Sequence, residues 1–334
     1  MRLDYIDNAK AMAILLVIIG HTDGIPHFLE IFIYSFHMPA FFFLSGYLVK
    51  DSKLGIKFKT YAGIQFRNLI IPYLFFAVFS LLYSILNNFI SRNPIDLYSK
   101  LLGIAYGNCD GLVVNRVLWF FTCLFVTSLL FYLLFKALKK AYLVMLVSLA
   151  TCLLFMYFHN PSQMRMPWNL DLSIIALFFF AAGKFYSEIS IKNDLVKKNG
   201  TRIAFVILLC IALFYLSKLN GRIDMAYMVF KNPLLFVANG CIGIVIVLLS
   251  SLLLPPTKMA RFLSRNTIVI FPLHPLIFSV FTAVGMMIFK LPHSFQATML
   301  FAGIYSCGAI ILCYPASLLL FNFLPIAVGG RKKL

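Results

Sequence analysis

Charged residues are scarce in this sequence. Only 12% of its 334 residues are Asp, Glu, Lys or Arg, whereas 62% are hydrophobic and the mean hydropathy is +0.92. A soluble domain of this size cannot hide so much apolar surface from water. This scarcity of charge excludes an ordinary soluble protein. We therefore expect one integral membrane domain over residues 1–334, without a separate soluble part.

The sequence also lacks the patterns that bind metals and nucleotides. Its seven cysteines show neither a CxxC pair nor a Cys/His ligand spacing, and no glycine-rich phosphate loop is present. We therefore predict no metal site and no disulfide framework. The formal net charge of +18 would suggest nucleic acid as the partner of a soluble protein. Along a membrane face, the same Lys and Arg residues predict contacts with anionic lipid head groups, so we expect membrane lipids and no nucleic acid as partners.

Long apolar runs fill most of the chain. A helix that crosses a bilayer needs about 20 predominantly apolar residues. Runs of this kind predict an all-α transmembrane bundle of about ten spans. Nine or eleven spans fit as well, because the seventh span is short and the 91–116 connection has room for an amphipathic or re-entrant piece around Asp96–Tyr106. We take the first run as a span and not as a removable signal, because no small-residue cleavage site follows it. The predicted spans are 10–27, 31–49, 69–90, 117–135, 141–158, 170–186, 202–218, 231–254, 267–289 and 296–323.

The basic residues indicate which way the spans run. Lys and Arg accumulate in short cytoplasmic loops. With the N-terminus inside, the inner loops and ends hold 21 of the 29 basic residues, and the excess recurs at each successive loop. This bias predicts that both termini are cytoplasmic. The remaining eight basic residues fall on the predicted outer side: Arg92, Lys100, Arg116, Arg165, Lys218, Arg222, Lys231 and Lys290.

Two ionisable residues share one face of the first predicted span. Eleven steps of 100° separate Lys10 from His21, which returns to within about 20° of the same direction, and the rise is about 16 Å. If Lys10 lies at the cytoplasmic interface, His21 lies near or just beyond the bilayer midplane. Ionisable side chains at that depth are costly and mark functional sites. His21 is therefore a candidate functional residue, and the alternative is a histidine hydrogen-bonded between helices.

The second predicted span runs back from the outer side and carries His37 about 9 Å from its outer end. Pro39 is expected to loosen this helix, and Ser45 with Gly46 supplies a small-residue surface for the close approach of another helix. We therefore predict a polar pocket between the first two spans, with His37 and Ser45 as candidate substrate-binding residues.

Three further residues are candidates, two of them with an alternative. Arg67 at the start of the third span could join Lys10 in binding the phosphates of an anionic cofactor, or it could be an interfacial anchor. His274 lies between Pro272 and Pro275, in a stretch expected to be broken and to line a cavity, and it is a candidate substrate-binding residue. Trp119 is a candidate for stacking on a sugar substrate, or it belongs to an aromatic belt at the membrane interface.

Several segments together resemble a known family. IDNAKAMAILLVIIGH at 6–21, SFHMPAFFFLSGYL at 35–48 and RNLIIPY at 67–73 are similar to segments of the acyltransferase-3 family of integral membrane acyltransferases, particularly its fucose 4-O-acetylase-like branch. LWFF at 118–121 and LHP at 273–275 add weaker support. Many members carry an arginine, ten residues and then a histidine taken as catalytic. Here Lys10 replaces that arginine, which keeps the charge but loses the bidentate fork.

The resemblance implies the transfer of an acyl group, usually acetyl from cytoplasmic acetyl-CoA, to a hydroxyl of a cell-envelope sugar. The acceptor would be a glycan or lipid-linked sugar of O-antigen, capsule or exopolysaccharide, and the location the bacterial cytoplasmic (inner) membrane. Acyl-CoA would bind with its phosphates near Lys10 and Arg67. His21 would then act as general base on the acceptor hydroxyl, or would itself carry the acyl group briefly.

Two other functions fit the same sequence. A transporter or flippase of lipid-linked saccharides would share the many spans and the basic inner face, although no inverted repeat is evident. A nonenzymatic partner of a polysaccharide synthase would keep its function after loss of His21. Transfer of label from acetyl-CoA to a glycan separates the enzyme from both alternatives.

Overall fold

A computed structural model describes residues 4–160, 164–190 and 199–330. Within these ranges the chain folds almost entirely into helices, and the only β-type contact is the isolated bridge between Asp224 and Val229. The helices are α1 (Asp4–Gly20), α2 (His27–Tyr34), α3 (His37–Tyr47), α4 (Asp51–Leu54), α5 (Phe58–Gln65), α6 (Ile71–Ile90), α7 (Leu97–Tyr106), α8 (Trp119–Leu138), α9 (Ala141–Phe158), α10 (Leu170–Ser190), α11 (Asn199–Asn220), α12 (Pro233–Leu253), α13 (Lys258–Arg265), α14 (Thr267–Met287) and α15 (Met299–Phe323). A π-helical turn, Phe66–Ile70, joins α5 to α6 without a break.

The all-α membrane bundle is confirmed. In the described part of the chain, nine helical segments are long and apolar enough to cross a membrane, where the sequence predicts about ten. The remaining expected span is α1, which has only 17 residues and starts at Asp4, earlier than predicted. Its length is about 25 Å. Because α3, α12, α13, α14 and α15 pack around it, α1 needs no lipid contact to be stable.

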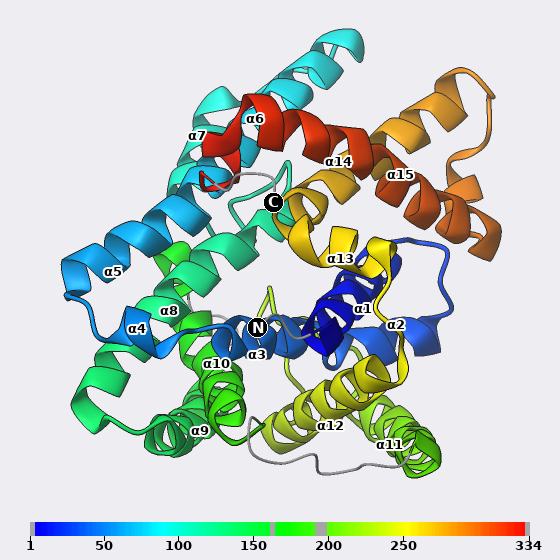
Figure 1. The fold of residues 1–334 in the computed structure, drawn as a ribbon. Coiled ribbons are helices and arrows are strands. Elements are labelled where there is room, and N and C mark those ends of the chain that lie inside the picture. The colour runs from blue at the N-terminus through cyan, green and yellow to red at the C-terminus, as the bar shows by residue number, and fades with distance from the viewer. Residues whose placement is uncertain (1–3, 161–163, 191–198, 331–334) are drawn as a thin grey trace.

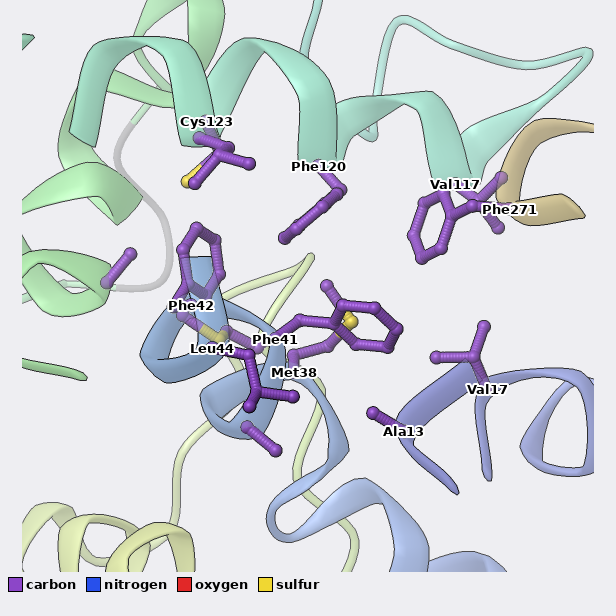
Figure 2. Packing of buried hydrophobic residues seen from close by; sticks show 14 of the residues in the cluster. Ala13, Val17, Met38, Phe41, Phe42, Leu44, Val117, Phe120, Cys123 and Phe271 are labelled. Atoms are coloured by element: carbon purple, nitrogen blue, oxygen red, sulfur yellow. The ribbon is translucent and has the colours of Figure 1, made fainter. Parts of the chain in front are cut away.

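The bundle is arranged around α1 and α3 (Figure 1). The largest helix contacts of α3 are with α10, and those of α1 are with α13 and α12. Figure 2 shows Ala13 and Val17 of α1, Met38 and Phe41 of α3 and Phe120 of α8 around one apolar centre. The Phe41, Phe120 and Phe271 rings lie 5.1–6.0 Å apart, which ties α3, α8 and α14 together there.

The small-residue surface predicted on the second span is confirmed at Gly46. A Cβ atom on Gly46 would lie 1.9 Å from the carbonyl oxygen of Phe180, and one on Gly183 would lie 1.9 Å from that of Phe43. Only glycine lets two backbones come this close. The α3–α10 contact is therefore fixed by one glycine on each helix.

Several local predictions need correction. The second span is not one helix loosened at Pro39: it breaks at Ser35 and Phe36, which leaves Pro39 in the first turn of α3, where its missing N–H costs little. The stretch around His274 is not broken, because α14 runs continuously through Pro272 and Pro275. The seventh span is not short, since α11 has 22 residues.

Two further expectations concern the connections. The amphipathic piece expected around Asp96–Tyr106 is confirmed as α7, whose first turn is capped by Asp96. Arg67 does not start the third span but lies inside it, in the π-helical turn of a continuous helical segment from Phe58 to Ile90. Part of the predicted inner basic set lies outside the described residues: Arg2, Lys192, Lys197, Lys198, Arg331, Lys332 and Lys333.

Candidate active site

Three histidines from distant parts of the chain meet in the bundle. His21 directly follows α1, His37 begins α3 and His274 lies in α14. The centroid of the His21 ring lies 5.1 Å from that of His274 and 6.4 Å from that of His37. These residues, called the histidine cluster below, include the predicted catalytic residue and two of the predicted substrate-binding residues. The cluster thus lies where the sequence predicts a polar pocket between the first two spans, and it also includes a residue of α14.

One tautomer is favoured in all three rings. Each Nδ1 lies within hydrogen-bonding distance of the carbonyl oxygen four residues earlier: 2.8 Å from Val17 for His21, 2.9 Å from Ile33 for His37 and 3.2 Å from Ile270 for His274. Because a carbonyl oxygen only accepts, each Nδ1 carries the hydrogen. A neutral ring of this kind has its lone pair on Nε2, which is then the nitrogen that accepts a proton.

The three rings differ in access. His274 is 0% and His37 is 4% exposed, whereas His21 is partly exposed. The Nε2 atom of His274 is buried and has no hydrogen-bond partner among the residues that the structure describes. His21 is therefore the member of the cluster that a substrate reaches most readily, with His274 directly beside it.

Charged and aromatic side chains lie next to the cluster. The Tyr34 ring is 4.9 Å from the His37 ring and 6.1 Å from the His21 ring, and the guanidinium carbon of Arg222 lies 4.8 Å above it. Arg222 Nε donates to Glu30 at 2.7 Å, and Nη2 lies 3.6 Å from Asp224. We call Glu30, Arg222 and Asp224 the charged rim.

Asp224 interacts electrostatically with His21. Burial raises the pKa of its carboxyl, while Arg222 opposes that effect. Its side chain also accepts from the backbone N–H groups of Ala226 and Tyr227, which holds the turn in shape. A negative charge placed in this way stabilises an imidazolium on His21 during proton transfer.

The turn that carries Asp224 is attached to α10. Arg165 Nη1 donates to the carbonyl oxygen of Ala226 at 2.9 Å, and its Nε donates to Asp171 at 2.7 Å. Both members of this ion pair are largely buried. Asp171 belongs to the first turn of α10, so a main helix of the bundle fixes the position of Asp224.

The protein family to which the chain belongs follows from a family model. The acyltransferase-3 family model, described as an acyltransferase domain, matches residues 3–318. The chain is a member of the acyltransferase-3 family. No curated protein and no solved structure matches it. With its apolar helices, the chain is thus a multi-pass membrane acyltransferase.

In this acyltransferase the two predicted phosphate-binding cations have different neighbours. Lys10 Nζ donates to the carbonyl oxygen of Ser264 in α13 at 2.6 Å, and Asp7 accepts from the hydroxyl of the same serine. Arg67 is exposed and lies against the turn at Gly330, where an added Cβ would clash with its guanidinium group. Lys10 therefore contributes a hydrogen bond to the α1–α13 contact, and Arg67 contacts the chain's last described turn.

The remaining predicted substrate-binding residues lie away from the histidine cluster. Ser45 donates to the carbonyl oxygen of Phe41 and lies about 12 Å along α3 from His37. Trp119 is only 5% exposed and packs near Phe42, a position that fits neither an interfacial belt nor an open stacking surface. In this acyltransferase Trp119 is a packing residue of the core.

Sequence reasoning missed the charged rim. Arg222 and Asp224 follow α11 and lie about 200 residues from His21, so no spacing rule connects them. A usable signal was present, because charged residues are scarce and Asp224 lies two residues after Arg222 in a connection on the predicted outer side. Such a pair between apolar helices indicates an ionic contact with neighbouring side chains.

Proposed function

We propose that this membrane acyltransferase moves an acyl group, most simply acetyl, from cytoplasmic acyl-CoA to a hydroxyl of a cell-envelope sugar, with His21 as the general base. The observation that carries the proposal is the state of His21: its Nδ1 donates to Val17, its Nε2 is the basic nitrogen, and it is the most accessible member of the histidine cluster. A neutral imidazole held in this tautomer is suited to accept a proton from a hydroxyl.

In direct transfer, His21 Nε2 takes the proton of the acceptor hydroxyl as its oxygen attacks the thioester carbonyl carbon. The new C–O bond forms and the C–S bond breaks. The CoA thiolate that leaves then takes the proton back from the His21 imidazolium. Asp224 stabilises the positive charge that the ring carries between these two events.

In relayed transfer, His21 Nε2 attacks the thioester itself, and CoA leaves as the thiol with the proton that the ring gives up. The acyl group then sits on His21, so a second base is needed for the acceptor hydroxyl. His274 fits that role, because its ring is 5.1 Å away and its Nε2 has no partner. We keep both routes, since the cluster supplies the groups that each one needs.

The orientation supports a cytoplasmic acyl donor. If Lys10 faces the cytoplasm, about 16 Å of helix rise separates it from His21. The helix α13, which lies beside Lys10, then places three more cations on the cytoplasmic side: Lys258, Arg261 and Arg265. Cations suit the phosphates of CoA. This orientation also puts the charged rim on the outer side, where an envelope sugar of a bacterial inner membrane would enter.

Membranes that contain the protein, incubated with labelled acetyl-CoA and envelope glycans, test the proposal. We expect label in the glycan with the wild type and with His159→Ala, a histidine after α9 that lies outside the cluster. We expect none above background with His21→Ala, although the protein inserts and runs as a folded species. Near-normal glycan labelling by His21→Ala would contradict the proposal, and glycan movement without label would favour a transporter.

A further inference from the structure

A second polar feature lies next to α14, away from the residues of the histidine cluster. A narrow cavity, open at its mouth and with room for about one water-sized group, lies between α6, α7 and the segment that leads into α8. Its walls are apolar and include Ala77, Ile104, Leu112 and Leu118. Three polar residues also line it: Ser80, Lys100 and Asn115.

Asn115 is the polar group at the buried end of this cavity. It is 2% exposed, and its Nδ2 donates both hydrogens, to Ser80 Oγ at 2.9 Å and to the carbonyl oxygen of Pro272 at 2.9 Å. Ser80 in turn donates to Phe76, so it can only accept from Asn115. This pattern fixes the amide orientation and leaves Oδ1 buried, with no hydrogen-bond partner in the described part of the chain.

An unpartnered buried oxygen is costly, and a donor that enters the cavity would remove the cost. Because Oδ1 only accepts, the matching ligand group is a hydroxyl or another O–H or N–H donor. The same amide holds the carbonyl of Pro272, two residues before His274. A ligand hydroxyl on Asn115 would therefore lie beside the turn of α14 that carries His274.

Lys100 supplies a positive charge to the same cavity. Its Nζ donates to Ser84 Oγ at 2.6 Å, which uses one of three N–H groups. No carboxylate in the described part of the chain lies within ion-pair distance of it. An ammonium group in this setting favours an oxyanion such as a phosphate.

The surroundings of the cavity are apolar. α6 and α7 expose Val78, Leu82, Leu101 and Leu102, as helices in contact with lipid do. A ligand that enters here would therefore keep an apolar part outside the cavity. These observations together describe an amphiphile and not a free sugar.

We propose that this cavity binds the head of a membrane amphiphile, with a hydroxyl on Asn115 Oδ1 and a phosphate on Lys100. The class includes lipid-linked sugar phosphates, so the occupant would be the acceptor, held beside α14; this assignment of the occupant as acceptor rests on the proposed function. The binding itself does not, and it is measured without acyl transfer.

The test uses the full chain purified in lauryldimethylamine oxide, a detergent without hydroxyl groups. Native mass spectrometry gives the apparent Kd of the first bound phosphatidylglycerol, which has hydroxyls and an anionic phosphate, and of phosphatidylmethanol, which has the same anionic phosphate and no hydroxyl. We expect phosphatidylglycerol to bind about tenfold more tightly. Equal Kd values for the two lipids in the wild type would overturn the proposal.

Three variants locate the site. Asn115→Leu, Lys100→Met and Val113→Phe should each raise the Kd for phosphatidylglycerol about tenfold, whereas the exposed matched controls Asn87→Leu and Lys218→Met should not. Val113 is 58% exposed and lines the cavity, so its variant fills the space without disturbing the Asn115 bonds. Val113→Phe therefore still tests the site if Asn115→Leu does not fold. Unchanged binding by all three would overturn the proposal.

A soluble head group separates the two sources of this chemistry. Glycerol phosphate carries the hydroxyls and the phosphate without the acyl chains. We expect it to compete with phosphatidylglycerol at least about tenfold more weakly than the lipid, because it has no apolar part to place against α6 and α7. Competition as strong as that of the lipid would overturn the assignment to a membrane amphiphile.

Discussion

The sequence predicts functional residues toward both ends of α1, but the structure gives these residues different kinds of contact. At its C-terminal end, His21 meets His37 and His274, residues from helices that begin 16 and 246 positions further on. At its N-terminal end, Lys10 is bonded to the backbone of α13, while Arg67 lies on a different contact. Buried histidines have few ways to be satisfied in an apolar bundle and so converge on one another, whereas cations near an interface can each be solvated or bonded separately.

The comparison predicts different kinetic effects at the two ends. The largest should come from His21→Asn, which removes the base and keeps a polar side chain. We expect kcat to fall about 10³-fold with little change in the KM for acyl-CoA, because general base catalysis contributes to the transition state and not to donor binding. Steady-state rates with labelled acetyl-CoA measure both constants. A rise in KM with kcat unchanged would show that His21 binds the donor. The difference proposed between the two ends of α1 would then be wrong.

His274→Ala separates direct from relayed transfer within the histidine cluster. We expect glycan acylation to fall about 10²-fold if His274 is the second base, because a positioned base contributes that much. In the relayed route His21 is still acylated, so a rapid-mixing experiment should show one equivalent of CoA released per enzyme without product. Absence of this burst, with the same loss of turnover, would leave direct transfer as the route.

Asp224→Asn tests whether the charged rim acts on His21. We expect about a tenfold lower kcat, since the negative charge that stabilises the imidazolium is lost. Burial raises the pKa of Asp224, so this carboxyl takes up a proton at a higher pH than an exposed one would, and wild-type activity should decline early on acidification. The pH profile of the variant should lack that early decline. Arg222 and Tyr227, the other groups beside Asp224, stay unchanged in this test.

The helices were predictable because their signal is local. Apolar runs, the cap at Asp96 and the small residues at Ser45 and Gly46 act over one or two helix turns, so their positions follow from the sequence alone. The break at Ser35 and the continuity of α14 through Pro272 were not predictable, because neighbouring helices decide whether a freed backbone group finds a partner. Asn115, for example, bonds the carbonyl of Pro272 from 157 positions away.

The site was predictable in part for the same reason. Ionisable residues inside apolar runs are rare, so His21, His37 and His274 were identifiable one at a time. Their convergence depends on how α1, α3 and α14 cross, which no spacing records. Trp119 illustrates the opposite error: an aromatic residue at the start of an apolar run resembles an interfacial residue, but η2, the turn at Arg116–Leu118, carries it into the core.

The smallest effects should come from the other end of α1. Lys10→Ala and Arg67→Ala should each raise the KM for acyl-CoA about fivefold with kcat nearly unchanged, because a partly solvated cation–phosphate contact contributes only about 1 kcal/mol. Lys59→Ala, an exposed cation on the preceding helix α5, should change neither constant. Double replacement sharpens the result: if the two residues hold one donor at separate points, their effects on KM multiply. An effect of Lys10→Ala on kcat alone would instead assign Lys10 to the α1–α13 contact that positions His21, and would remove the donor site from this end of the helix.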